Sequence, residues 1–404
     1  MDRRIVVFSS SPLRARGGGP STYLWNLRMG ICRLGTEIGN LVAFAVPETV
    51  ERSDRVMTRI RMSAARFARW GVAMFPELWW EAYSAYVKHK VARRVERLVV
   101  LHREVLRHST FVHAHSVLDA YTLRRLVHIP MILTVHTPEP LDKEIGYLLE
   151  RRYGSASEKL LRWIAHAERE AFQMAYALFY PSKEATEAHL TALPWLEEVF
   201  SNKKVYFILT GVPAMKRYPS AEKLREQLGV GDAIFVLYVG RYNTIKGFDL
   251  YIEIFRRLQG HPFVFGSLGR GDIQAPKAPG FIDLGWVDDP SPFMSAADLL
   301  VLPSRMSYFD LVGLEAMSLG LPILASAVGG NKTLAQYSRG VVLFKSGDAD
   351  AGARALLDVA QAGRSWLREL GVANERAYQD HFTLEKFAKR YLDTVLEVLN
   401  VQNG

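Results

Sequence analysis

The sequence predicts an α/β protein built from two doubly wound parallel sheets. Short β-branched or aromatic runs alternate with longer amphipathic stretches, which is the pattern of βα units. The alternation occurs in two successive series, and a length of 404 residues leaves room for a complete core in each of two domains. A lone module is therefore excluded.

Each series contains six expected strands. The first comprises residues 4–10, 40–46, 110–115, 131–136, 177–181 and 205–209; the second comprises 233–240, 262–267, 281–284, 299–303, 322–326 and 341–344. A glycine and two prolines interrupt regular structure within 210–219, so we predict domains at 1–211 and 212–383. Open parallel sheets bind ligands at the carboxyl ends of their strands, so both domains are expected to face one central cleft.

Composition excludes several classes of protein. The hydrophobic fraction of 49% and charged fraction of 23% are those of an ordinary globular chain, not of a disordered or fibrous one. Cys32 is the one cysteine, so no internal disulfide forms and the cytoplasm is the expected location. We find neither a signal-peptide core at the start nor an apolar stretch long enough to span a membrane.

The net charge of +9 is concentrated in one segment. Residues 52–107 hold 13 Lys/Arg and 5 Asp/Glu, whereas the rest of the chain is nearly balanced. The segment is expected to be helical, with interruptions near Gly71 and Pro76, and its arginines stand among aromatic residues. Two interpretations stay open: a helical hairpin with solvated arginines, or a platform for an acceptor or an anionic membrane.

Two loops have the chemistry of a phosphate site. Residues 17–22 (GGGPST) follow the first strand and lead into a helix, which is the geometry of a phosphate cradle. Residues 240–247 (GRYNTIKG) follow the first strand of the second series and present Arg241 and Lys246. A guanidinium fork and a mobile ammonium suit a diphosphate, although either loop alone is also consistent with a plain turn or solvated cations.

A third stretch, residues 303–323, begins as a strand end and polar loop and continues as a short helix, LVGLEAMS. A helix that begins at Leu311 and Val312 would aim unpaired N–H groups and its positive dipole end at an anion. Glu315, one turn further on, could accept hydrogen bonds from the vicinal hydroxyls of a ribose. Taken alone, this glutamate could equally be a solvated helix residue.

Together these residues resemble retaining glycosyltransferases of family 4, which have the GT-B fold of two Rossmann-like domains. The resemblance rests on Gly18 and Gly19, on the pair Arg241 and Lys246, and on the stretch from Pro303 to Pro322 followed by Val328. It runs in order from about residue 4 to residue 395 and is weakest across 48–108. It implies that the last helix, within 384–404, crosses back to the first domain.

The resemblance also assigns roles by position. Arg241 and Lys246 correspond to the pair that neutralises the donor diphosphate, and Glu315 to the carboxylate on the nucleotide ribose. His115 corresponds to the histidine that faces donor sugar and acceptor, whereas His113 and His136 are expected to be structural. Gly18, Gly19, Leu311 and Val312 belong to the expected donor site.

One position departs from the family pattern. The family has two glutamates with seven residues between them, and the first contacts hydroxyls of the transferred sugar. Here Ser307 occupies that first position, and Asp310 restores a carboxylate three residues later. The departure concerns the identity of the donor sugar, and it is compatible with a different sugar preference or with a weakened enzyme.

The implied activity is transfer of a hexosyl or N-acetylhexosaminyl group, with retention and without a metal, from a UDP- or GDP-linked sugar to an acceptor hydroxyl. The acceptor is a glycan, a lipid-linked molecule or a small molecule, as in polysaccharide biosynthesis; no cofactor and no nucleic acid are expected. Two alternatives stay open: a noncatalytic nucleotide-sugar-binding protein, or another GT-B enzyme such as a nucleotide-sugar epimerase. The cytoplasmic location includes peripheral association with the inner face of a membrane through residues 52–107.

Overall fold

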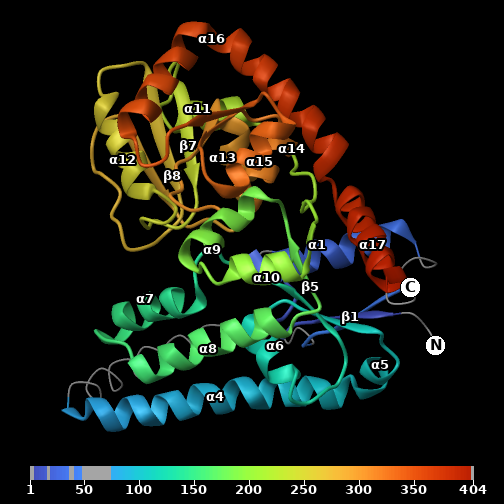
Figure 1. Ribbon diagram of the computed structural model, residues 1–404. Helices are drawn as coiled ribbons and strands as arrows, with labels where there is room; N and C mark the ends of the chain where they lie inside the picture. The colour runs from blue at the N-terminus through green and yellow to red at the C-terminus, as the bar shows by residue number, and fades with distance from the viewer. Residues whose placement is uncertain (1–3, 16–18, 36–40, 48–73, 402–404) are drawn as a thin grey trace. The chain divides into compact units, whose positions relative to one another are not determined.

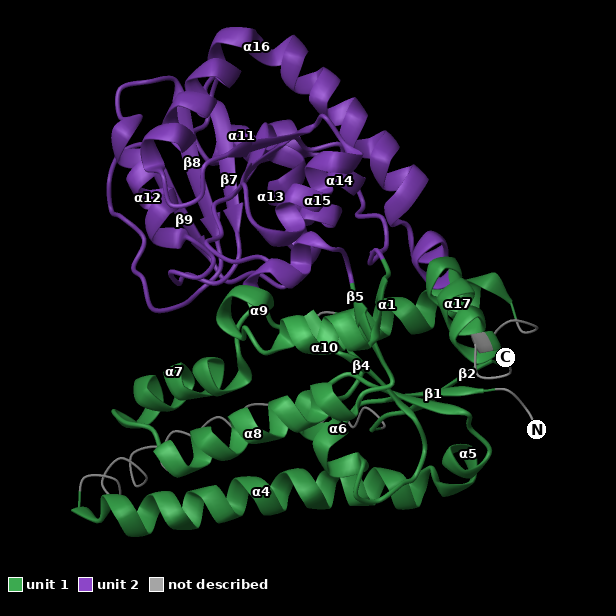
Figure 2. Ribbon diagram, viewed as in Figure 1, with its two compact units in different colours: residues 1–180, 189–208, 389–404 green, residues 181–188, 209–388 purple. Residues whose placement is uncertain are grey.

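The structure is a computed structural model that describes residues 4–15, 19–35, 41–47 and 74–401. The described chain divides into two compact units (Figures 1 and 2). Unit 1 comprises residues 1–180, 189–208 and 389–404, and unit 2 comprises 181–188 and 209–388. Gly17 and Gly18, and the part of the basic segment before residue 74, lie outside the described residues.

Unit 1 contains a parallel sheet in the order β2-β1-β3-β4-β5-β6. Its strands are β1 (Ile5–Phe8), β2 (Val42–Ala45), β3 (Phe111–Ala114), β4 (Met131–Thr134), β5 (Ala177–Tyr180) and β6 (Lys204–Phe207). Its helices are α1 (Gly19–Leu34), α4 (Pro76–Leu101), α5 (Arg103–Arg107), α6 (Val117–Leu123), α7 (Leu141–Tyr153), α8 (Glu158–Met174) and α10 (Leu196–Asn202). The helix α9 (Glu187–Ala192) begins in unit 2 and ends in unit 1.

Unit 2 contains a second parallel sheet, in the order β12-β11-β10-β7-β8-β9. Its strands are β7 (Ile234–Val239), β8 (Phe263–Leu268), β9 (Phe281–Gly285), β10 (Leu299–Leu302), β11 (Ile323–Ser326) and β12 (Val341–Phe344). Its helical segments are η1 (Glu184–Thr186), α11 (Ala221–Gln227), α12 (Phe248–Arg257), α13 (Ser291–Ala296), α14 (Leu311–Ser318), α15 (Gly329–Tyr337), α16 (Ala349–Ala377) and η2 (Tyr378–Phe382). The last helix, α17 (Leu384–Val401), passes from unit 2 into unit 1.

The fold class predicted from the sequence is confirmed. Every expected strand is present, and its bounds differ from the expected ones by at most two residues. Both sheets are parallel and doubly wound, and helices connect successive strands within each sheet except β8 and β9, which a helix-free segment joins. In unit 2, buried residues of β7, β8 and β10 pack with Tyr251 of α12 and Leu356 of α16 into one apolar core.

Gly247 fixes the loop between β7 and α12. Its φ of 69° lies in the left-handed region, and a Cβ at this position would stand 1.9 Å from the carbonyl oxygen of Pro303, which follows β10. The close approach therefore joins the loops that follow two neighbouring strands, and only glycine permits it.

We predict that Gly247→Ala destabilises unit 2 more than left-handed strain alone would. Gly229→Ala is the matched control, because Gly229 also has a positive φ, 67°, but has no atom within 4 Å of an added Cβ. We expect the control to cost about 1 kcal/mol of unfolding free energy and Gly247→Ala to cost about 2 kcal/mol more through overpacking. Urea denaturation measures both, and equal losses would contradict the role given to the close approach.

Candidate functional site

Each sheet has one point at which the strand order diverges. In unit 2 the chain runs outward from β7 to β8 and β9, and then returns to place β10 on the other side of β7. The loops that follow β7 and β10 meet at this divergence, which is the position at which open α/β sheets bind ligands. Residues 240–247 and 303–310 form these two loops.

Lys246 and Asp310 meet at this point. The Nζ of Lys246 donates to Oδ1 of Asp310, and the side chains are 24% and 13% exposed. The other oxygen of Asp310 accepts from Ser304 Oγ at 3.4 Å and from Ser307 Oγ at 3.3 Å. The buried Ser307 thus helps to hold the nearby carboxylate.

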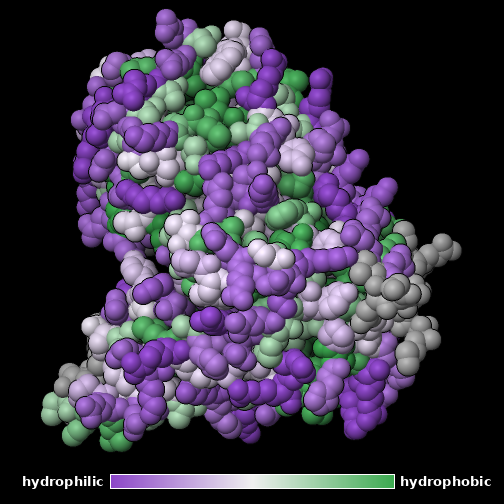
Figure 3. Space-filling view, viewed as in Figure 1, coloured by the Kyte–Doolittle hydropathy of each residue, from purple (hydrophilic) through white to green (hydrophobic). Residues whose placement is uncertain are grey.

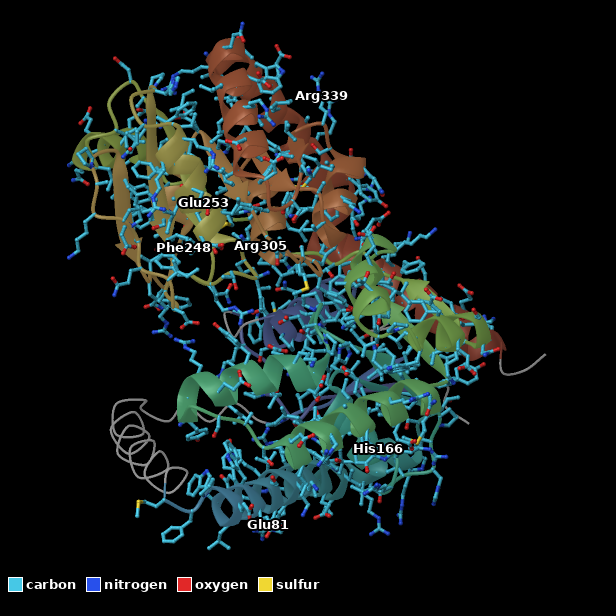
Figure 4. All side chains as sticks on the ribbon, turned by 60° about the vertical axis from the view of Figure 1, so that its left-hand side comes forward. Glu81, His166, Phe248, Glu253, Arg305 and Arg339 are labelled. Atoms are coloured by element: carbon cyan, nitrogen blue, oxygen red, sulfur yellow. The ribbon has the colours of Figure 1, made fainter. Side chains whose placement is uncertain are left out.

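A network of hydrogen bonds holds the two loops in place. The guanidinium of Arg305 donates to the carbonyl of Thr244 at 2.9 Å and to Oδ1 of Asp249 at 2.7 Å (Arg305 is labelled in Figure 4). The backbone N–H of Lys246 donates to Asn243 Oδ1 at 2.9 Å. Lys246 is therefore presented by a rigid loop rather than by a mobile one.

Arg241 lies in the same loop, one position after Gly240. Its carbonyl accepts from the hydroxyl of Tyr238 at 2.6 Å, which fixes the backbone, whereas its side chain is exposed. Within the described part of the chain, the guanidinium has neither a hydrogen bond nor an ion pair. It therefore retains all five of its donors for a ligand.

Helix α14 begins at Leu311, as the sequence predicts. Asp310 occupies the N-cap position but makes no side-chain cap, because its carboxylate is engaged by Lys246 and the two serines. In the described chain, the N–H groups of Leu311 and Val312 have no hydrogen-bond partner. These donors and the positive end of the helix suit an anion. Glu315 is half-buried one turn further along.

The corresponding point of unit 1 lies between β1 and β3, and it carries histidines instead of cations. His115 follows β3 and is 3% exposed, and its backbone N–H donates to the carbonyl of Phe8 at 3.2 Å. Its Nδ1 lies 3.0 Å from Nε2 of His136, which follows the neighbouring strand β4. Tyr23 of α1 packs edge-on against His136, with ring centroids 4.8 Å apart.

His113 forms its own hydrogen bonds with two buried hydroxyls, and its ring centroid lies 4.0 Å from that of His115. Its two ring nitrogens lie 2.8 Å from the hydroxyls of Tyr391 and Thr134. Burial, together with the neighbouring His136, lowers the pKa of His113 to about 3. Burial also lowers the pKa of His136 to about 3. The expectation that His113 is structural matches this network, whereas His136 is in contact with the candidate functional residue His115.

Of the residues singled out in the sequence, the structure brings Lys246, Ser307 and Asp310 into direct contact. Arg241, Leu311 and Val312 lie in the same two loops, with Glu315 on the helix that follows. Gly19 begins α1 and is exposed, and Gly18 lies outside the described residues. His115 is in unit 1. In the described ranges, no three His, Cys, Asp or Glu side chains gather where they could hold a metal ion.

The sequence analysis missed three residues that shape the site. Arg305 and Asn243 hold the two loops, and Asp119 accepts a hydrogen bond from the N–H of Ser10 at 2.7 Å and so fixes the loop after β1. Arg305 and Asn243 lie within motifs that had been singled out for other residues. No periodicity or spacing marks Asp119, because its partner is 109 positions away.

Comparisons with known proteins agree with this arrangement. Residues 233–362 match the family described as "Glycosyl transferases group 1", and this range includes Arg241, Lys246 and the whole of α14. Over this range the chain resembles the group 1 glycosyltransferases. The chain is 26% identical over 350 residues to the alpha-D-kanosaminyltransferase of Streptomyces kanamyceticus, covering 80% of this chain and 87% of that protein.

Another relative is the D-inositol 3-phosphate glycosyltransferase of Geodermatophilus obscurus, 26% identical over 439 residues, with coverage of 95% of this chain and 87% of the relative. Among solved structures, the sucrose-phosphate synthase of Thermosynechococcus elongatus has a TM-score of 0.69 at 19% identity, covering 99% of this chain and 100% of that one. Anabaena HepE in complex with UDP-glucose has a TM-score of 0.65 at 15% identity, with coverage of 98% and 99%. These likenesses show that the glycosyltransferase has the GT-B fold.

We predict that buried His113 makes the glycosyltransferase lose stability in acid. Its pKa is about 3 in the folded chain and 6.5 in the unfolded chain, so between these values the unfolded chain binds more protons. The stability that neutral His113 contributes is present above pH 6.5 and is lost as pH falls toward 3. Between pH 6 and pH 4 the unfolding free energy of the wild type should fall with decreasing pH. In His113→Gln this slope should be smaller than in the wild type by up to about 1.4 kcal/mol per pH unit.

The exposed His128 supplies the control. His128→Gln should follow the wild-type pH dependence in the same urea denaturation series. An unchanged slope in His113→Gln would show that His113 does not carry this linkage.

Proposed function

We propose that the chain transfers a sugar, with retention of anomeric configuration, from a nucleotide-diphosphate sugar to an acceptor hydroxyl. One observation carries the proposal: Arg241, Lys246 and the open N–H groups of Leu311 and Val312 gather at the strand-order divergence of unit 2. Two cations and two aligned amide donors match the charge of a diphosphate. Two relatives are named for sugar transfer: one is a kanosaminyltransferase and the other is an inositol 3-phosphate glycosyltransferase. Their names support a sugar-transfer reaction.

The chemistry follows from where charge develops. As the bond between sugar and diphosphate breaks, negative charge grows on the leaving phosphate oxygen, and the preorganised cations and amides stabilise it. A leaving phosphate oxygen then takes the proton of the acceptor hydroxyl, so the reaction requires neither an enzyme nucleophile nor a metal ion. NMR of the anomeric proton in the product distinguishes this retaining reaction from inversion.

The donor is proposed to be a UDP- or GDP-linked hexose or N-acetylhexosamine. Glu315 is placed one turn into α14, where its carboxylate can accept from the ribose hydroxyls. Asp310 stands near the position at which the family has its first glutamate, and Ser304 and Ser307 orient it. We assign to Asp310 the contact with the transferred sugar, and to His115 of unit 1 a contact with a substrate hydroxyl.

Two other functions would give different results. A noncatalytic nucleotide-sugar-binding protein would bind the donor without turnover for any acceptor. A nucleotide-sugar epimerase would change the stereochemistry of the sugar rather than transfer it to an acceptor. Formation of a new glycosidic bond therefore decides among the three.

We predict that Arg241→Ala and Lys246→Ala each weaken binding of UDP or GDP by at least about tenfold in isothermal titration calorimetry. Each substitution removes a charge-assisted contact to the diphosphate, and such contacts contribute about 1.5–3 kcal/mol. The losses should shrink as salt concentration rises, because Arg241 is exposed and its attraction is screened.

Two controls accompany this experiment. Arg257→Ala removes a cation of the same unit that pairs with Asp350 and lies at the end of α12 away from the site, and it should leave affinity unchanged. The double variant Lys246→Ala/Asp310→Asn removes both charges of the ion pair, so it shows whether an unpaired Asp310 causes any loss. Unchanged affinity in both single variants would refute the diphosphate site.

We also propose that unit 1 contacts an anionic membrane at the start of α4. Met74, Phe75 and Leu78 are 56%, 57% and 69% exposed there, and Figure 3 shows hydrophobic surface at this end of the helix. Basic residues follow along the helix, including Lys88, Lys90, Arg93 and Arg94. Glu77 and Glu81 lie among the apolar residues, and the first of these basic residues is ten positions beyond Leu78. The proposal therefore combines apolar insertion at the helix end with attraction of the basic side chains further along the helix. In the described chain, no helix is long and apolar enough to cross a bilayer.

We predict that the chain floats with phosphatidylserine-containing liposomes and that the double variant Phe75→Glu/Leu78→Glu does not. Two carboxylates would oppose both apolar insertion and the anionic surface. Val372→Glu, at a residue of unit 2 that is 60% exposed, is the matched control and should float like the wild type. Equal flotation of all three proteins would refute this surface. The expected location stays the cytoplasm.

A further inference from the structure

The imidazoles of His115 and His136 are coupled by a direct hydrogen bond. Their rings meet edge to edge, with centroids 5.3 Å apart and planes 19° from parallel, and Nδ1 of His115 faces Nε2 of His136 at 3.0 Å. The parallel pairing of β3 with β4 brings the two histidines to the same edge of the sheet, because His115 directly follows the paired residue Ala114 and His136 lies three positions beyond Leu133. The contact is thus built into the sheet.

Both rings are neutral at physiological pH. Burial lowers the pKa of His115 well below its ordinary value of 6.5, and His113 and His136 lower it further. A neutral imidazole has one N–H donor and one lone-pair acceptor. The contact between the two rings therefore contains a single proton, on either His115 Nδ1 or His136 Nε2. If Nδ1 of His115 carries the proton, Nε2 of His115 is an acceptor; if His136 Nε2 carries it, Nε2 of His115 is a donor.

The remaining nitrogens decide between the two arrangements. Nε2 of His115 is buried and has no hydrogen-bond partner in the described chain, whereas His136 is only partly buried. A buried N–H without an acceptor is a rarer and costlier arrangement than a buried acceptor without a donor. The lower-cost arrangement puts the proton of His115 on Nδ1, where it donates to His136, and leaves a lone pair on Nε2. Nδ1 of His136 then carries the proton of that ring.

We propose that His136 is a positioning residue that holds His115 in its Nδ1–H tautomer, so that Nε2 of His115 presents a hydrogen-bond acceptor to a substrate hydroxyl. The tautomer follows from the geometry of unit 1 alone; the hydroxyl rests on the proposed function. Tyr23 supports the arrangement, because it packs against both rings, with centroids 5.6 Å from His115 and 4.8 Å from His136. The helix that begins at Gly19 is thereby linked to the histidine pair.

The test is the tautomeric state of His115 in the full chain labelled with ¹⁵N-histidine. Long-range ¹H–¹⁵N correlation spectra at pH 7.5 identify the protonated nitrogen, and the His115 signals are assigned by their loss in His115→Gln. We expect protonated Nδ1 and unprotonated Nε2 in the wild type. His136→Phe removes the acceptor and should transfer population to the Nε2–H tautomer. His136→Gln keeps an acceptor on a side chain of similar reach and should preserve the wild-type state.

His128→Phe is the matched control, because it makes the same replacement at an exposed histidine outside the pair; its His115 signals should equal those of the wild type. An Nε2–H tautomer of His115 in the wild type overturns the proposal, and this result does not depend on whether His136→Phe folds. If His136→Phe does fold, an unchanged tautomer of His115 in that variant also overturns the proposal. Failure of the proposed function is a separate result: a chain that binds neither UDP-glucose nor GDP-mannose in calorimetry, yet shows the expected tautomer, refutes the sugar-transfer function and supports the positioning role.

Discussion

The ion pair between Lys246 and Asp310 is the interaction on which the unit 2 site depends. Both side chains are largely removed from solvent, and an unpaired charge in such a position would be costly. Pairing with Lys246 also occupies the carboxylate at the N-cap of α14, which would otherwise bond to the first-turn amides. The same contact thus stabilises a partly buried cation and leaves the amides of Leu311 and Val312 open. A ligand anion would enter a place where both charge and donors are already fixed.

The fold could be predicted almost completely, because β-branched runs that alternate with amphipathic stretches have a purely local origin. The loops that carry Arg241, Lys246 and Leu311 could also be placed, since each directly follows an expected strand. The hydrogen bonds and close contacts between these loops could not be predicted. Arg305 binds the carbonyl of Thr244, 61 positions earlier, and no local pattern indicates such a contact. The role of Gly247 likewise depends on a carbonyl that belongs to another strand's loop.

The contact of His136 with His115 could not be predicted for a different reason. A histidine at a strand end is most often structural, and the sequence gives no reason to treat this one otherwise. The order of strands in the sheet changes that interpretation, because β3 and β4 are neighbours in parallel register and their carboxyl ends coincide. Histidines that follow such strands lie at the same edge of the sheet, where their side chains can meet. The information was present in the sequence, but it becomes usable only when the pairing of the strands is known.

The substitution of Ser307 can be understood from the same loop. A glutamate at this buried position would need its own cation or hydroxyl partners, whereas a serine needs only one acceptor, and Asp310 supplies it. Compared with a glutamate at position 307, Asp310 places a carboxylate three residues closer to α14 and on a shorter side chain. Because Asp310 is shorter and directly paired with Lys246, it can reach less far toward a sugar ring while keeping the local charge balanced. The change therefore acts on recognition of the transferred group, and the cations and amides proposed to bind the diphosphate are left as they are.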